Sequence, residues 1–210
     1  MIYEMRTYDL KPRTQGEFEK RFGEAYEKRK NYSPLAAFWH SEIGPLNQVI
    51  HVWPYKDLEE RNRIRTAAVK DGIWPPATTE FIVNMRSEIM IPFSISPELK
   101  PGKMGPYYEM RTYTHVAGDL PKLRQVWEKA VPERLKFSPL CAAWYSELGG
   151  LNKFVHIWPY PSLDVRIATR DKAHAAGVWP PSAEKLGLPP YQLVAQENKI
   201  LMPSSFSPLQ

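Results

Sequence analysis

The strongest constraint on this chain is that it contains the same domain-sized unit twice. Residues 33–55 (SPLAAFWHSEIGPLNQVIHVWPY) recur at 138–160 (SPLCAAWYSELGGLNKFVHIWPY), at an offset of 105, with 14 of 23 positions identical and no gap. The same offset carries YEMRTY at 3–8 onto 108–113. A unit of about 100 residues is too long for a solenoid repeat and has the size of an independent domain. We therefore expect two similar modules, residues 1–100 and 107–210, joined by a linker at 101–106.

Composition places the chain among soluble globular proteins. Of its 210 residues 43% are hydrophobic, enough to bury a core. No apolar run reaches the roughly 18 residues of a membrane span, and the N-terminus MIYEMRTYDL lacks the features of a signal peptide. The single cysteine, Cys141, excludes a disulfide within the chain. These features predict a cytoplasmic protein of a reducing compartment that does not act on membranes.

The charge pattern argues against nucleic-acid binding. The formal net charge is +5. The densest basic stretch, from Arg61 to Lys70, alternates with acidic and apolar residues, whereas nucleic-acid binding favours clustered cations with exposed aromatics. Arg61 and Arg65 lie one helical turn apart and recur as Arg166 and Arg170. We expect them on a solvated helix face, or on one that pairs with another surface.

Each module shows the same order of predicted elements. Residues 2–8 alternate as a strand, and apolar residues at helical spacing follow from Phe18 to Tyr26. Two strands then flank the turn at 43–47, a helix spans about 58–70, and a last strand lies near 86–91. The order β-α-β-β-α-β is that of a ferredoxin-like module, whose antiparallel sheet has both helices on one face. The predicted class is therefore α+β, with two such modules.

Alternation along the strands divides the side chains between two faces of each sheet. Ile50 and Val52 form an aliphatic face, which we expect to meet the helices. The opposite face carries polar and aromatic residues that are identical in the two modules: Glu4, Arg6, Tyr8, His51 and Trp53, and Glu109, Arg111, Tyr113, His156 and Trp158. A partly apolar face without helices needs a cover. We therefore expect the two modules to pack sheet to sheet as a pseudo-twofold dimeric α/β barrel within one chain.

These motifs resemble the NIPSNAP family. The resemblance rests on YEMRTY at 3–8, the hairpin from Trp39 to Asn47, the HVWPY and HIWPY strands, and the tails FSISP and SSFSPL. It covers nearly the whole chain, one family domain per module, and implies a dimeric α/β barrel. Related barrels include cofactor-independent monooxygenases, isomerases and haem-handling proteins, but bacterial family members mostly lack an assigned reaction. Eukaryotic relatives resemble mitochondrial proteins, whereas this sequence begins without a targeting extension.

The ten matched residues are the candidate ligand-binding site, which we expect to line the barrel interior. An arginine can clamp a carboxylate, a histidine can move a proton near neutral pH, and tryptophan supplies an aromatic wall. The alternative is a structural network, because a buried Glu4 or Arg6 needs a partner whether or not a ligand binds. The histidines lack the neighbouring ligands of a zinc site, and no nucleophile or phosphate-binding motif occurs. We expect neither a metal nor a cofactor.

Three functions stay open at this stage. The first is binding of a small aromatic or carboxylate-bearing molecule between the sheets, with no assigned reaction. The second is a cofactor-independent monooxygenase or isomerase, in which His51 and His156 are needed for turnover. The third is a protein-interaction scaffold that uses the outer helices or the proline-containing tails. Closure of the barrel within one chain makes an obligate dimer unnecessary and leaves homo-oligomers to form through the outer surfaces.

Overall fold

The order β-α-β-β-α-β occurs twice in the computed structural model, which describes residues 1–210. The first half consists of β1 (Ile2–Leu10), α1 (Gln15–Arg29), β2 (Ala37–Ile43), β3 (Gln48–Tyr55), α2 (Leu58–Lys70), a short 3-10 turn (Thr79–Phe81) and β4 (Ile82–Pro92). The second half consists of β5 (Tyr107–His115), α3 (Leu120–Arg134), β6 (Ala142–Leu148), β7 (Lys153–Tyr160), α4 (Leu163–Ala175) and β8 (Leu193–Pro203).

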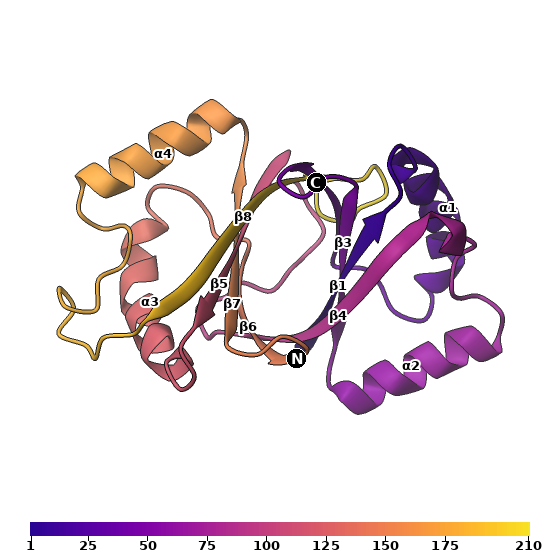
Figure 1. Cartoon of the computed structure of the whole chain (residues 1–210), viewed down its shortest axis with the longest axis horizontal. Helices are drawn as coiled ribbons and strands as arrows, with labels where there is room; N and C mark the ends of the chain where they lie inside the picture. The colour runs from indigo at the N-terminus through magenta and orange to yellow at the C-terminus, as the bar shows by residue number, and fades with distance from the viewer.

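The eight strands close into one barrel, in the order β1-β3-β2-β8-β5-β7-β6-β4. Neighbouring strands are antiparallel throughout. The two halves join at both edges, where β2 pairs with β8 and β4 pairs with β6. Helices α1 and α2 lie on one side of the barrel and α3 and α4 on the other (Figure 1). The predicted fold class, two ferredoxin-like modules forming an α/β barrel in one chain, is confirmed.

The barrel interior is a packed core drawn from both halves. It holds 17 buried hydrophobic residues, among them Met5, Ile50 and Val52. Aromatic rings cross between the halves. Tyr3 stacks on Trp144 with ring centroids 4.7 Å apart, and Trp39 lies 5.4 Å from Tyr108. The expectation that Ile50 and Val52 meet the helices is therefore wrong, since these side chains face the barrel interior.

The helices cover the opposite face of each sheet, and this face is rich in aromatic residues. In the first half Phe18, Phe22 and Tyr26 of α1 pack with Phe38 and Trp53 of the sheet. In the second half Trp127 takes the place of Phe22 in a corresponding cluster. The alternation of side chains along the strands was predicted correctly, but the two faces were assigned to the wrong layers.

The segments after β4 and β8 exchange between the halves. Phe93, after β4, packs on Phe154 of the second half with ring centroids 4.8 Å apart. Phe206, after β8, packs on Phe38 of the first half at 4.9 Å. The hydroxyl oxygen of Ser207 accepts a hydrogen bond from the backbone amide of Phe38, at 2.9 Å. Each half therefore completes the helix-side core of the other.

None of the helices combines the length and the hydropathy that crossing a membrane requires.

Candidate functional site

The ten predicted site residues lie on the outer faces of the sheets, beneath the helices, and not in the barrel interior. The location fails for all of them: Glu4, Arg6, Tyr8, His51 and Trp53 in the first half, and Glu109, Arg111, Tyr113, His156 and Trp158 in the second. The physical reason is charge. The core of the barrel interior is mainly apolar, whereas the helix layer supplies arginines that pair with the two buried glutamates.

The carboxylate of Glu4 is the centre of the first-half site. Its Oε1 atom accepts hydrogen bonds from Arg6 at 2.8 Å, Arg61 at 2.6 Å and the hydroxyl of Ser87 at 2.8 Å. Arg65 lies on the other side, with Nη1 3.6 Å from Oε2. The Glu4 side chain is fully buried, while the three arginines keep 13 to 29% of their side-chain exposure. One buried acid is thus surrounded by three partly exposed cations.

These arginines keep Glu4 ionised. Burial alone would raise the pKa of Glu4, but the hydrogen bond from Arg61 and the charges of Arg65 and Arg6 outweigh it and lower the pKa to about 2. In the second half Glu109 pairs with Arg111 at 3.0 Å, Arg166 at 2.5 Å and Arg170 at 3.8 Å. Its pKa is lowered in the same way, against burial and mainly by Arg166.

The role of the α2 arginines was mispredicted. Arg61 and Arg65 were expected on a solvated or interface-pairing face of the helix, but they point to the sheet and hold Glu4. Their spacing of four residues places both on one side of α2. The signal for this role was in the sequence, because Glu4 and both arginines recur together as Glu109, Arg166 and Arg170.

A further buried cation in each half was not predicted. Arg29, at the end of α1, is 1% exposed, and its guanidinium lies 4.7 Å from the ring centre of Trp53. Its polar contacts are neutral groups, the hydroxyl of Ser33 at 3.0 Å and that of Tyr55 at 3.4 Å. Burial lowers the pKa of Arg29, although the residue stays charged at neutral pH. Arg134 repeats the arrangement over Trp158.

His51 is held within the aromatic layer. Trp53 donates its indole N–H to Nδ1 of His51 at 2.7 Å, so the neutral ring carries its proton on Nε2. That nitrogen is buried and has no partner. The rings of Tyr8 and Phe22 lie 4.9 and 5.0 Å from the imidazole. Burial, followed by the charge of Arg6, lowers the pKa of His51 well below its usual range.

His156 has the same surroundings. Trp158 donates to its Nδ1 at 2.8 Å, its Nε2 is buried without a partner, and burial lowers its pKa. Both imidazoles are therefore neutral across the physiological pH range. No group of three or more histidine, cysteine, aspartate or glutamate side chains is arranged to hold a metal ion.

A cleft opens beside this layer in the first half, between α1, the α2–β4 connection and the outer face of the sheet. We call it the Tyr8 cleft. Its volume is about 280 Å³, and it is lined by Tyr8, Phe22, Trp74, Pro75, Pro76, Thr78, Thr79, Ile82 and Met85. The Tyr8 hydroxyl accepts a hydrogen bond from Nε of Arg6 at 2.7 Å. The cleft therefore has aromatic walls and adjoins the arginine cluster.

The corresponding surface of the second half is built differently. Trp127 replaces Phe22, and Gln196 replaces Met85. The connection between α4 and β8 is six residues longer than its counterpart, and its Tyr191 packs against the helix-side core. The ring of Tyr191 lies 5.6 Å from that of His115, and burial raises the pKa of Tyr191. The longer connection thus adds an aromatic side chain to the helix-side core of the second half.

Comparison with known proteins gives consistent matches. The NIPSNAP family model matches residues 3–97 and 108–208. The human protein "Protein NipSnap homolog 3A" is 31% identical over 217 residues, which cover 100% of this chain and 86% of that protein. "Protein NipSnap" of Drosophila melanogaster is 25% identical and covers 100% of this chain and 79% of its own length.

Solved structures of low identity share the whole architecture. A putative monooxygenase from Lactobacillus acidophilus aligns over 96% of this chain and 92% of its own, with a TM-score of 0.63 and 9% identity. At that identity the likeness concerns the fold alone.

Proposed function

The chain belongs to the NIPSNAP family, and we propose that its first half binds a small aromatic organic anion in the Tyr8 cleft. The observation that carries this proposal is the position of an aromatic-walled cleft next to an excess of buried and partly buried cations. Binding between the two sheets, the location expected from the sequence, is not proposed because the barrel interior is filled by side chains.

The cleft has the shape and lining of a small-molecule site. Trp74, Phe22 and two prolines supply flat apolar walls, while Thr78 and Thr79 add hydroxyl groups. Ligand pockets combine such apolar walls with a few polar groups, and typical volumes begin at about 300 Å³. A cleft of about 280 Å³ therefore suits a ligand with one or two rings.

The charge balance favours an anion. Arg6, Arg29, Arg61 and Arg65 lie in the helix–sheet layer of the first half, where Glu4 is their one buried acid. Four cations against one carboxylate leave three positive charges without an acidic partner, and this is costly for Arg29, which is fully buried. A carboxylate or phenolate on the ligand would compensate one of them through charge-assisted hydrogen bonds.

Tyr8 connects the aromatic and the charged parts of the proposed site. Its hydroxyl oxygen accepts from Arg6, so its own O–H is available to donate to a ligand. Burial, partly offset by the charge of Arg6, raises the pKa of Tyr8 and keeps the phenol protonated. A ligand in the cleft would meet a hydrogen-bond donor at the end nearest the arginines.

Catalysis is the second candidate, favoured by one observation. The unpartnered Nε2–H of His51 lies in a ring that contacts Tyr8 and Phe22, two walls of the cleft. A rearranged ligand complex would bring this group to a substrate as a hydrogen-bond donor that stabilises developing negative charge. We place binding first because those two rings separate His51 from the cleft.

Native mass spectrometry of the purified full chain, followed by titration with 1-naphthoate, tests the proposal. We expect Trp74→Ala to weaken naphthoate binding at least tenfold, and Trp74→Phe to retain most of it. The matched control Trp179→Ala, in the second half, should change affinity less than twofold. Melting temperatures of all variants identify any loss caused by unfolding.

Two results would overturn the assignment. One is the absence of both a co-purified organic anion and naphthoate binding in the millimolar range. The other is an equal loss in folded Trp74→Ala and Trp179→Ala, which would show that the Tyr8 cleft has no special role.

A further inference from the structure

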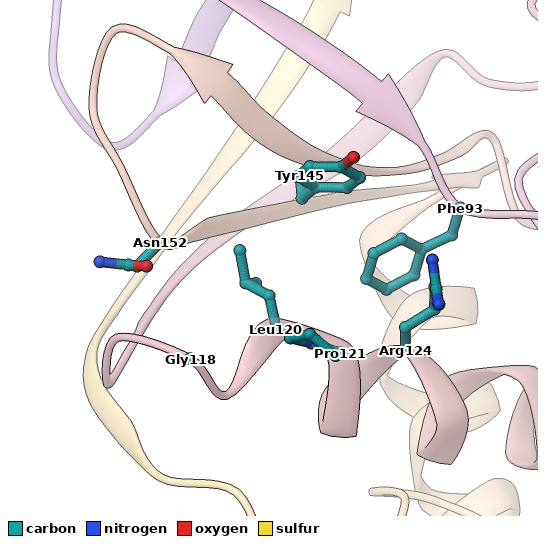
Figure 2. Close-up of a pocket in the computed structure, with 7 residues that line it drawn as sticks. All are labelled: Phe93, Gly118, Leu120, Pro121, Arg124, Tyr145 and Asn152. Atoms are coloured by element: carbon teal, nitrogen blue, oxygen red, sulfur yellow. The ribbon is translucent and has the colours of Figure 1, made fainter.

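A second pocket lies on the side of the barrel that α3 covers, away from the Tyr8 cleft. It is formed where the start of α3 faces β6 and the segment after β4, and we call it the junction pocket (Figure 2). Its volume is about 320 Å³. Phe93, Leu120, Pro121 and Tyr145 form its apolar walls, and Arg124 supplies the one charged side chain of its lining.

The junction pocket exists only in the closed barrel, because both halves contribute to it. Phe93 comes from the exchanged segment of the first half and stacks on Phe154 of β7. Its ring lies 6.0 Å from that of Tyr145 in β6. The Leu120 side chain rises from the first turn of α3 toward Tyr145, and Arg124 extends toward Phe93 (Figure 2).

The equivalent residues of the first half form a polar network. At the offset of 105, Leu120, Arg124 and Tyr145 correspond to Gln15, Glu19 and His40. The amide of Gln15 donates to Glu19 at 3.2 Å, and Nδ1 of His40 lies 2.9 Å from the same carboxylate. All three members of this network are replaced together in the second half. The replacement exchanges the carboxylate for a cation and removes its partners.

Arg124 has no acidic side chain within hydrogen-bonding distance. The nearest acid is Glu128, one turn along α3, at 3.9 Å. That distance exceeds a hydrogen bond, and the same Glu128 oxygen already accepts a 2.5 Å hydrogen bond from Ser94. A guanidinium with free N–H groups at the edge of an apolar pocket is suited to hold a carboxylate in a bidentate manner.

The geometry points to the junction pocket as a binding site for a small carboxylate with a single aromatic ring. The ring would lie among Phe93, Leu120 and Tyr145, and the carboxylate would pair with Arg124. This inference is independent of the function proposed for the Tyr8 cleft, since the two pockets share no residue and lie against different helices, α3 and α1.

The test uses 4-fluorobenzoate with the full-length chain in the Trp74→Ala background, which removes the contribution of the Tyr8 cleft. Fluorine NMR measures its affinity, and amide chemical shifts locate it. We expect the largest shift changes at Gly118 and Asn152, which line the junction pocket. 4-Fluorotoluene, which lacks the carboxylate, should bind at least fivefold more weakly.

The decisive variant is the double substitution Arg124→Glu with Tyr145→His, which transplants the Glu19 and His40 side chains of the first half. We expect it to weaken 4-fluorobenzoate binding at least tenfold while the melting temperature changes little. The matched control, Glu19→Gln in the first half, should leave the affinity unchanged. Shift changes elsewhere, or equal binding to a folded double variant, would overturn the assignment.

Discussion

Glu4 shows how one acidic side chain organises a layer of cations. Its carboxylate is fully buried, and hydrogen bonds from Arg6, Arg61 and Ser87 meet at one of its oxygens. Removing one partner of such a buried group leaves the others uncompensated, at a cost of about 3–5 kcal/mol. The glutamate is therefore needed for folding whether or not a ligand occupies the neighbouring cleft.

Glu4→Gln should change the acid dependence of stability. The pKa of Glu4 is about 2 in the folded chain and near 4.5 when unfolded, so the ionised group stabilises the fold above pH 4.5. This contribution, about 3 kcal/mol, is lost as pH falls from 4.5 toward 2. Urea unfolding should show the variant to be less stable at pH 7, with a gap to the parent that narrows by pH 3.

The control is Glu17→Gln on the exposed face of α1, which should change stability little at either pH. A gap for Glu4→Gln that stays constant between pH 5 and pH 3 would contradict the assigned ionisation of Glu4.

For individual residues, the sequence predicted which side chains share a sheet face but not whether that face lies inside the barrel or under the helices. Alternation along β1 and β3 correctly placed Glu4, Arg6 and His51 on one face. Whether this face would lie inside the barrel or beneath the helices depended on partners distant in sequence. These partners are Arg61 and Arg65, which reach Glu4 only because of the way α2 packs on the sheet. Arg29 could not be predicted because its partners, Trp53 and Tyr55, are neutral.

Among the elements, the exchanged segments after β4 and β8 bind the two halves together. The ring of Phe206 lies against Phe22, Phe38 and Tyr26 of the first half, with centroids 4.9 to 6.3 Å apart. It crosses α1 at Gly23, where an added Cβ atom would come within 2.8 Å of the ring. The sequence showed these segments as tails, but not that each packs on the other half, because the exchange depends on barrel closure.

Phe206→Ala should destabilise the whole chain by about 2–3 kcal/mol, since it removes a partly buried aromatic ring from a packed cluster. Urea unfolding followed by tryptophan fluorescence measures the loss. Ser205→Ala, which changes an exposed neighbour, is the matched control and should stay within about 0.5 kcal/mol of the parent. Equal stability of Phe206→Ala and Ser205→Ala would show that the segment contributes nothing to the first-half core.

The whole molecule depends on closure of the barrel. Pairing of β2 with β8 and of β4 with β6 leaves no open sheet edge at either junction, and the interior core draws residues from both halves. The sequence repeat predicted this closure correctly, because each module has one sheet face that needs a cover. Neither half can bury Tyr3 or Trp39 without the other.

The first half expressed alone, residues 1–100, should therefore associate into a homodimer. Its β2 and β4 would pair across a twofold axis and rebuild an eight-stranded barrel, because its inner face would otherwise be exposed to water. Light scattering coupled to size-exclusion chromatography measures the mass. A folded, monomeric first half at micromolar concentration would falsify the view that closure is required.

Fusion of the two halves into one polypeptide also removes a restriction on their evolution. In a homodimer each substitution enters both subunits, so a pocket altered in one is altered in its twin. Here one half has His40 and Glu19, while the other has Tyr145 and Arg124 at the matching positions. After gene duplication, two binding surfaces can thus diverge separately, while the shared barrel holds them at fixed relative positions.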